Sequence, residues 1–440
     1  MSNHRSVIRR RAAAIAAAAS IAALLLAGCT STSPAKDLSL TVQVQAEQLT
    51  AFKYAAGLLE KKHPGLKVHL QTITGEQKNT TNAQVLASSN APDVGIVPTN
   101  AQTYFDLMKA KKLIPLDDVW KSADLAARYG DTVAKSLKWN GTPYLALFDT
   151  VYYNVVFYNK DAFTKAGVKA PADRQIASNA DLYALVGKLK AAGYDGLAVG
   201  GASGYQLGWL VDAQLQANAS PAALHDFLTS WQSGNKQSVK YTSPKFTGSL
   251  AQLSEWGKHG VFQSGYVAAS GDQAQAAFTS GTAAMMIGGT WIPSVLKKQS
   301  FDYDWLLLPG AGDTPTVPSI YAGDTLAIPT ASKHKDLAKE YLEIYSSDKV
   351  QKYAAAKVGS LPAVNTVKAS EVPDLGPLVQ QVVKFTATKV GIGWTSTLPG
   401  GLGQTLIDSE AQKMLSGQST PEEVGKSQQK EFETYKSDNG

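Results

Sequence analysis

The sequence predicts an α/β protein with more than one sheet. Patterns typical of strands and of helices alternate along roughly 400 residues, as they do where helices cover sheets. The chain has 440 residues, which exceeds the size at which a single hydrophobic core keeps growing, so we expect two lobes. Hydrophobic residues make up 44% and charged residues 18% of the sequence, and this balance favours a globular protein over a disordered one.

The alternation begins with a strand, a helix and a second strand. Apolar and polar residues alternate over 40–44, which predicts a strand. One helical face carries Leu49, Phe52, Ala56 and Leu59, and His63-Pro64-Gly65 predicts the end of that helix. A second alternation over 66–70 completes a βαβ unit, so we expect a parallel sheet.

Later segments repeat the alternation. Strands are expected over 94–97 and 197–199, and a helix over 104–112. Ser178-Asn179-Ala180-Asp181 is a capping-box pattern that predicts a helix ending at Gly193. Thr420-Pro421-Glu422-Glu423 predicts the start of a helix that runs toward Tyr435.

Charge and cysteine content exclude several classes of function. The formal net charge is +6, but four of the cations are Arg5, Arg9, Arg10 and Arg11, which lie in a segment that we expect to be removed; the mature chain then carries about +2. No basic cluster interleaved with aromatic residues is present, so nucleic acid is not an expected partner. A single cysteine, Cys29, excludes intramolecular disulfides and cysteine-based zinc sites.

The first 28 residues are typical of a secretory signal. Four arginines precede the apolar run 12–27, which is short for a membrane span. Leu26-Ala27-Gly28-Cys29 resembles the lipobox of bacterial lipoproteins. The resemblance implies a signal peptide over 1–28, a diacylglyceryl group with fatty acyl chains such as palmitate on Cys29, and a flexible tether over 29–37. Alternatives are a simple secretory signal with an incidental cysteine, and twin-arginine instead of general secretory export.

Segments spread along the mature chain resemble one family in their order. They include a Phe-x-x-Gly-x-Ala-Ala-Met strand followed by Gly-Thr-Trp, and an Ala-Gly-Asp followed by Leu-Ala-Ile-Pro. The full set of segments, in chain order, is Ala91-Pro92-Asp93-Val94, Leu113-Ile114-Pro115-Leu116-Asp117, Tyr144-Leu145-Ala146-Leu147, Asp149-Thr150, Tyr158-Asn159-Lys160-Asp161, Ala166-Gly167, Phe278 to Met285, Gly289-Thr290-Trp291, Ala322-Gly323-Asp324, Leu326-Ala327-Ile328-Pro329, the helix 337–345 and Gly359 to Ala363. This order resembles the extracellular solute-binding proteins of ABC importers, in particular the carbohydrate-binding family that includes the maltose-binding protein.

The resemblance implies a two-lobed periplasmic-binding-protein type II fold, in which each lobe is a mostly parallel sheet flanked by helices. It implies crossovers near 149, 289 and 322, with lobe 1 formed by 38–149 plus 290–321 and lobe 2 by 150–289 plus 322–440. Ligands of α/β sheets sit beyond the carboxyl ends of strands, so a cleft between lobes is the expected site. The implied function is capture of a sugar or oligosaccharide at the extracellular face of the cell membrane, and its delivery by a monomeric protein to membrane permease subunits.

The candidate site residues are those placed at crossovers or at strand ends. A sugar presents apolar C–H faces and hydroxyls, so aromatic rings, carboxylates and amides are suitable partners. Trp291 follows Gly288-Gly289 and matches the family's stacking tryptophan, and Asp149 matches a cleft aspartate. The remaining candidates are Tyr321, Gly323 and Asp324 at the third crossover, Glu47 and Gln48 after the first strand, Thr99 and Asn100 after the strand 94–97, Tyr205 and Trp209 after a glycine-rich segment, and Trp394.

Each candidate has an ordinary structural alternative, namely core packing for the tryptophans, turn hydrogen bonding for the aspartates and a solvated helix start for Glu47 and Gln48. Trp120, Trp139, Trp231, Trp256 and Trp305 are assigned to packing.

Three other functions remain open. A secreted carbohydrate-active enzyme would need paired carboxylates, but no second acid is reliably near Asp149 and no nucleophile-elbow, His-Glu-x-x-His or phosphate-loop motif is present. The same fold could bind a non-sugar solute such as a polyamine, and a surface lipoprotein could act as an adhesin. The histidines are scattered, so no metal and no cofactor are expected.

Overall fold

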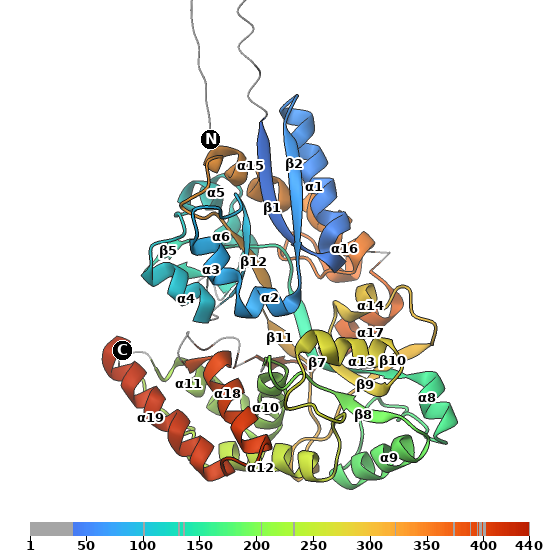
Figure 1. Ribbon diagram of the computed structural model, residues 1–440. Helices are drawn as coiled ribbons and strands as arrows, with labels where there is room; N and C mark the ends of the chain where they lie inside the picture. Colours follow the sequence, from blue (N-terminus) through green and yellow to red (C-terminus); the bar gives the residue numbers. More distant parts are fainter. Residues whose placement is uncertain are drawn as a thin grey trace, which may run out of the picture. The chain divides into compact units, whose positions relative to one another are not determined.

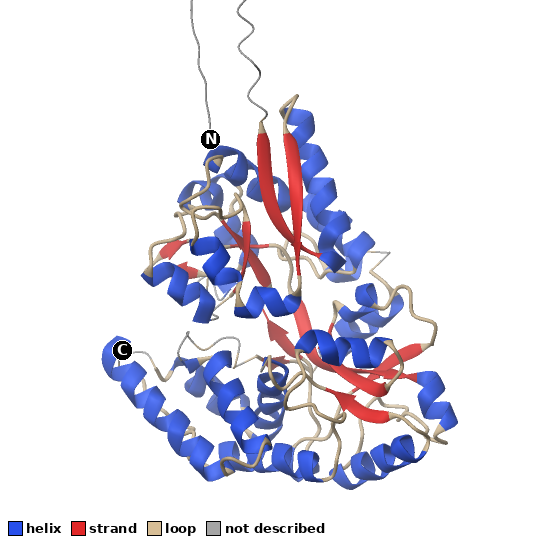
Figure 2. Ribbon diagram, in the orientation of Figure 1, coloured by secondary structure: helices blue, strands red, loops and turns tan. Residues whose placement is uncertain are grey.

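The computed structural model describes residues 38–99, 102–130, 133–134, 137–203, 205–231, 234–321, 323–372, 375–387, 389–393, 395, 398 and 402–439. The signal peptide, Cys29 and the tether lie outside these residues. Figure 2 shows strands lying among helices throughout the described chain, as the sequence predicts for an α/β protein. No described helix is long and apolar enough to span a membrane.

A first group of elements surrounds three small sheets, of which the smallest is the antiparallel pair of β4 and β5. The strands β1 and β2 are parallel, and β12 lies antiparallel between β3 and β6. The elements of this group are β1 (Ser39–Gln45), η1 (Ala46–Gln48), α1 (Leu49–Lys62), β2 (Lys67–Ile73), α2 (Gly75–Thr80), α3 (Asn82–Ala87), β3 (Gly95–Pro98), α4 (Gln102–Lys109), α5 (Asp117–Ser122), α6 (Leu125–Tyr129), β4 (Lys138–Trp139), β5 (Thr142–Pro143), β6 (Ala146–Leu147), β12 (Asp324–Ala327), α15 (Lys335–Tyr345) and α16 (Asp348–Val358).

A second group surrounds the sheet of the long strand β7. In this sheet β7 lies antiparallel to β9, β10 and β11, while β8 is parallel to β9 and β13 is parallel to β11. The elements are β7 (Val151–Asn159), α8 (Lys160–Lys165), α9 (Asn179–Ala191), β8 (Asp195–Ala198), α10 (Tyr205–Asn218), α11 (Pro221–Thr229), α12 (Pro244–Lys258), α13 (Gly271–Thr279), β9 (Ala283–Gly289), α14 (Ile292–Val295), β10 (Tyr303–Leu306), η2 (Ala311–Asp313), β11 (Ser319–Tyr321), η3 (Ala369–Glu371), α17 (Pro377–Thr386), β13 (Gly391–Ile392), α18 (Gln404–Leu415) and α19 (Pro421–Asn439).

The expected helix starts are confirmed at two capping sites. The Ser178 hydroxyl accepts a hydrogen bond from the Asp181 backbone N–H at 3.1 Å, at the start of α9. At the start of α19, Thr420 and Glu423 exchange two bonds, with the backbone of each donating to the side chain of the other at 2.8 and 3.2 Å. Such reciprocal bonds satisfy backbone donors that a helix leaves free at its first turn.

The opening βαβ unit is also confirmed, although β1 is buried more completely than its alternating pattern suggests. Leu40, Val42 and Val44 are fully buried, and so is the polar Gln43 at 1% exposure. The Gln43 amide donates to the Asn82 side chain at 2.8 Å and accepts from the Asn82 amide at 2.9 Å. These bonds compensate for the removal of both amides from water.

The strands β1 and β2 of the opening unit are parallel, as expected. The larger sheets contain antiparallel pairs, which corrects the mostly parallel sheets that the family resemblance implied. β12 is antiparallel to both β3 and β6, and β7 is antiparallel to β9.

The expected division of the chain is wrong in two places. Segment 290–321 belongs with β7, because β10 and β11 both pair with that strand. Segment 324–358 belongs with the first group, because β12 pairs with β3 and because α15 and α16 pack on α1 (Figure 1, orange beside blue). After β9 the chain therefore stays in the same sheet, and position 289 is not a crossover. The crossings lie around Asp149, between β11 and β12, and between α16 and α17.

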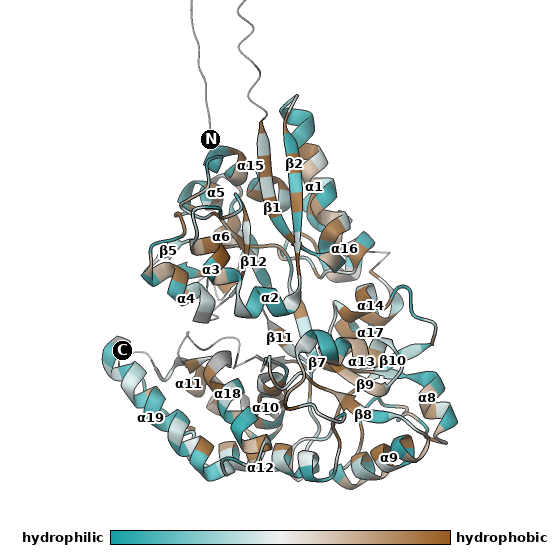
Figure 3. Cartoon of the chain, in the orientation of Figure 1, coloured by the Kyte–Doolittle hydropathy of each residue, from teal (hydrophilic) through white to brown (hydrophobic). Residues whose placement is uncertain are grey.

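Apolar burial explains the arrangement of the second group. All seven residues of β9 are buried, and Figure 3 colours this strand hydrophobic and much of α19 hydrophilic. A large core around β7, α10 and α12 includes Trp256, and a smaller one includes Phe157 and Trp305. Burial of such side chains contributes about 1.5–3 kcal/mol each.

Candidate functional site

A cavity of about 380 Å³ lies where elements of both groups meet. It is bordered by the ends of β1 and β2, by η1, α2 and the start of β7, and by α10, α13 and the residue before α14. Its lining residues are Gln45, Ala46, Glu47, Gln48, Thr72, Ile73, Thr74, Gly75, Lys78, Asn79, Pro98, Asp149, Val151, Tyr153, Tyr205, Trp209, Asp272, Gln275, Trp291 and Asp324. We call it the central pocket.

Four aromatic side chains form one side of the central pocket. The rings of Trp209 and Trp291 meet edge to face with centroids 5.5 Å apart, and Tyr205 meets Trp209 in the same way at 5.0 Å. Tyr153 lies 5.6 Å from Trp209 at a tilt of 47°. Both tryptophans are only partly buried, so this wall offers apolar ring surface to a ligand.

The backbone at the end of β9 positions Trp291. Thr290 ties this turn to β7, since its backbone N–H donates to the Tyr152 carbonyl at 2.9 Å and its hydroxyl accepts from the Tyr152 N–H at 3.3 Å. The indole then folds back over Gly289, where a Cβ atom would lie 2.1 Å from ring carbon Cζ3. Only glycine permits this close approach.

The opposite side of the central pocket carries carboxylates. Lys78 on α2 forms an ion pair with Asp324 at 2.6 Å, and each side chain is 14% exposed. Asp149 is buried at 4% exposure and accepts a hydrogen bond from the Gln48 amide at 3.2 Å. The Ser360 hydroxyl donates to the other end of the Gln48 amide at 2.8 Å, so Asp149 is held by a chain of side-chain bonds.

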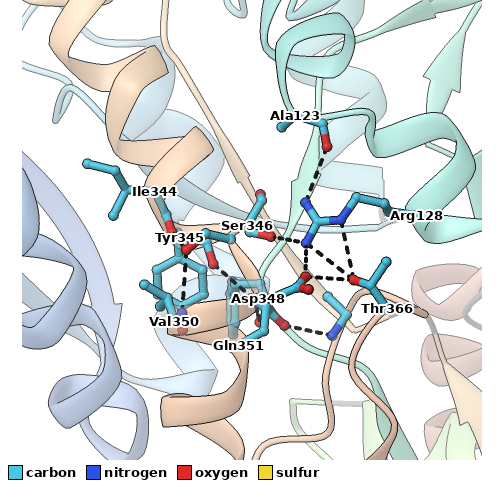
Figure 4. A network of polar contacts seen from close by, with 12 residues as sticks. Ala123, Arg128, Ile344, Tyr345, Ser346, Asp348, Val350, Gln351 and Thr366 are labelled. Atoms are coloured by element: carbon cyan, nitrogen blue, oxygen red, sulfur yellow. Dashed lines mark hydrogen bonds and ion pairs between the residues drawn. The ribbon is translucent and has the colours of Figure 1, made fainter.

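A polar network that includes Gln351 and Tyr345 (Figure 4) supports the backbone on both sides of Asp149. The Gln351 amide donates to the carbonyls of Phe148 and Tyr345 at 3.3 and 3.1 Å, and its oxygen accepts from the Ala363 N–H at 2.8 Å. The backbone N–H of Thr150 donates to the Leu361 carbonyl at 3.0 Å. The segment that contains Asp149 is thus fixed to the start of the crossing between α16 and α17.

Arg128 anchors the second half of the same network. Its guanidinium donates to the carbonyls of Ala123 and Ser346 at 3.2 and 2.7 Å and to the Asp348 carboxylate at 2.6 Å. Asp348 also accepts from the Thr366 hydroxyl at 2.6 Å. The planar fork of an arginine suits such a junction because it donates in several fixed directions.

Burial shifts the acidity of several side chains in the central pocket. Removal from water raises the pKa of Asp149 well above its ordinary value of 3.8, and the neighbouring Asp324 carboxylate raises it further. Burial also raises the pKa of Glu47, which Lys78 partly offsets. The pKa of the Tyr205 phenol is raised by burial first and then by Glu76 and Asp272. Burial thus disfavours the charged forms of Asp149 and Glu47 in the central pocket.

Comparison with known proteins places the chain in a family. Residues 43–352 match the model of the bacterial extracellular solute-binding proteins. The chain belongs to that family. A relative from Pyrococcus horikoshii, an uncharacterized ABC transporter extracellular-binding protein, is 24% identical over 77% of each chain. The sn-glycerol-3-phosphate-binding periplasmic protein of Escherichia coli K12 is 24% identical over 82% of this chain and 84% of its own.

A solved structure confirms the type II periplasmic-binding-protein fold. A chitin oligosaccharide binding protein superimposes with a TM-score of 0.71 and 19% identity, covering 91% of this chain and 99% of its own. The family comprises binding proteins rather than enzymes. Among the described residues of this solute-binding protein, no group of three or more His, Cys, Asp or Glu side chains is placed to hold a metal ion.

The central pocket of this solute-binding protein brings together seven of the residues selected from the sequence. They are Glu47, Gln48, Asp149, Tyr205, Trp209, Trp291 and Asp324. Thr99 lies behind the pocket and donates its hydroxyl to the Gly323 carbonyl at 3.0 Å, and Gly323 itself supplies a turn with φ of +86°. The backbone of Tyr321 pairs with β7. Asn100 and Trp394 lie outside the described residues.

The sequence analysis missed several lining residues. Thr72 is the next-to-last residue of β2 and Thr74 directly follows the strand, so both lie at a strand end, as Glu47 does. Lys78, Asn79, Asp272 and Gln275 lie within helices and carry no such signal. Tyr153 lies in the strand β7, and it belongs to the aromatic wall because its ring contacts Trp209, more than 50 residues later in the chain.

Proposed function

We propose that this solute-binding protein is a lipid-anchored receptor that captures a sugar or oligosaccharide in the central pocket and delivers it to the permease of an ABC importer. The observation that carries the proposal is an aromatic wall, with Trp209 and Trp291 in edge-to-face contact, opposite carboxylates and amides in one cavity. Aromatic faces suit the C–H surfaces of a sugar, and the polar groups suit its hydroxyls.

The polar lining supports a polyhydroxylated ligand more than a purely apolar one. Side-chain amides of Gln45, Gln48, Asn79 and Gln275 and hydroxyls of Thr72 and Thr74 can each donate and accept. A sugar hydroxyl does the same, so such groups can be matched pairwise on both sides of a ring. The cavity volume falls within the range of small-molecule pockets, about 300–1,000 Å³.

Contacts across the central pocket support capture by closure. The Ser203 hydroxyl donates to the Glu76 carboxylate on α2 and accepts from the Gly271 backbone N–H at 2.7 Å, so it joins α2 to the start of α13. Both helices line the pocket. In the proposed cycle the two lobes close over the sugar through the crossings around Asp149, between β11 and β12, and between α16 and α17, and the permease recognises the closed form.

The experiment is calorimetric titration of the mature protein with neutral mono- and oligosaccharides, before and after Trp291→Ala. Loss of a stacking indole should weaken binding by about 2 kcal/mol or more, which is about thirtyfold. Trp139→Ala is the matched control, because Trp139 is also partly buried but lies outside the central pocket. Unchanged affinity in Trp291→Ala would remove this residue from the site, and turnover of the sugar would favour the enzyme alternative.

A further inference from the structure

The central pocket carries an imbalance of charge. Four carboxylates line it, those of Glu47, Asp149, Asp272 and Asp324, against the single ammonium of Lys78. No arginine or histidine is found among its described lining residues. Lys78 is already paired with Asp324 at 2.6 Å. Among the described residues, Glu47, Asp149 and Asp272 have no ion pair of their own, although the Lys78 charge acts on Glu47 and Asp149 from a greater distance.

A second feature points to a missing donor. The Asp324 carboxylate uses Oδ2 for Lys78, whereas its Oδ1 is buried and has no hydrogen-bond partner among the described residues. A buried acceptor without a donor is costly. A ligand that brings a strong donor to this side of the pocket would relieve that cost.

From these features we infer that the pocket is selective for saccharides that carry a protonated amine, with the ammonium on the carboxylate side and the sugar rings on the aromatic wall. The inference rests on the proposed function and names the ligand class. An ammonium donates three hydrogen bonds and neutralises charge, which no hydroxyl does.

The same excess of carboxylates over cations, together with the amide side chains of the pocket, disfavours anions and bare polyamines as ligands. An anion such as a sugar phosphate would meet four carboxylates against one ammonium, and that ammonium, Lys78, is already paired with Asp324. A bare polyamine would satisfy the carboxylates but would leave the amides of Gln45, Asn79 and Gln275 without partners. An amino sugar satisfies both sets of groups.

The test compares two trisaccharides that differ only in acetylation. Chitosan trisaccharide carries free amines, whereas chitin trisaccharide carries neutral amides at the same positions. Titrated into the mature protein at pH 6, the chitosan trisaccharide should bind at least about tenfold more tightly, and 0.5 M salt should narrow the difference. Asp272→Asn should reduce only the affinity for chitosan trisaccharide, by about tenfold. Asp161→Asn, an exposed carboxylate on α8 outside the pocket, is the matched control.

The outcomes separate the inference from the proposed function. Equal or tighter binding of chitin trisaccharide, or an Asp272→Asn variant that loses both sugars equally, would overturn the inference and leave the sugar receptor standing. Spermidine binding with no sugar binding would overturn both in favour of the polyamine alternative. Tight binding of sn-glycerol 3-phosphate together with neutral sugars would overturn only the inference of an amino-sugar ligand. Tight binding of sn-glycerol 3-phosphate without any sugar binding would overturn the proposed sugar receptor as well.

Discussion

Replacement of Gly289 by alanine is the most direct test of how the aromatic wall is built. An added Cβ would lie 2.1 Å from Cζ3 of Trp291 and 2.4 Å from the carbonyl oxygen of Tyr152. To reach an ordinary 3.4 Å contact, the ring would have to withdraw by about 1.3 Å and the carbonyl by about 1.0 Å. The carbonyl is held by the Thr290 N–H at 2.9 Å, so the indole is the group expected to move.

The expected cost is that of an overpacked site, about 1–3 kcal/mol in the free energy of unfolding. Movement of the indole also breaks its contact with Trp209, so sugar affinity should fall although no polar ligand contact is removed. Urea denaturation measures the first effect and calorimetry the second. Near-ultraviolet circular dichroism reports the change in the environment of the paired indoles.

Gly187→Ala is the matched control for this substitution. Gly187 lies on α9 with nothing within 4 Å of an added Cβ, so alanine should stabilise the helix by up to about 1 kcal/mol. If Gly289→Ala unfolds at the same urea concentration as the parent and retains its dichroism and affinity, Trp291 does not pack on this glycine and the account of the wall is wrong.

Two further predictions concern Asp149 and Cys29. The pKa of Asp149 is raised in the folded state. From about pH 4 upward the unfolded chain therefore releases this proton first, and the free energy of unfolding falls with rising pH by at most about 1.4 kcal/mol per pH unit. In urea denaturation, Asp149→Asn should gain stability relative to the parent between pH 4 and pH 7, and a difference in free energy of unfolding that stays constant with pH would contradict the shift. Cys29→Ser should release the protein from membranes into the soluble fraction, because diacylglyceryl attachment needs the thiol; retention of this variant in the detergent phase would argue against the anchor.

Helix caps and the first strand and helix could be predicted from the sequence, because these features depend on residues close together in the chain. The caps at Ser178 and Thr420 were predicted because side chain and backbone lie three residues apart. The strand β1 and helix α1 were predicted because their apolar residues repeat with the right period. The assignment of β10, β11 and β12 failed because strand pairing is set by distant residues, and no pattern within 303–327 says which sheet accepts each strand.

The same distinction applies to the site. Trp291 and Asp149 were found through family motifs, and Glu47 and Gln48 through their place after a strand. Lys78 was missed because a charged residue on a helix looks solvated until another element covers it, and Asp272 because it remains exposed at the edge of the pocket. The charge balance of the pocket, on which the ligand class depends, was therefore not predictable from the sequence.

Gln48 illustrates how a correct selection can have an unexpected reason. It was selected as a residue able to meet ligand, yet its amide is buried at 4% exposure between Asp149 and Ser360, which lies 312 residues later in the chain. A buried amide with both ends bonded fixes the orientation of its neighbours, because any rotation leaves a donor or an acceptor unpaired. The carboxylate of Asp149 is thereby held in place before a ligand arrives, so less conformational freedom is lost on binding. Gln48 thus contributes to affinity by positioning Asp149 as well as by lining the pocket.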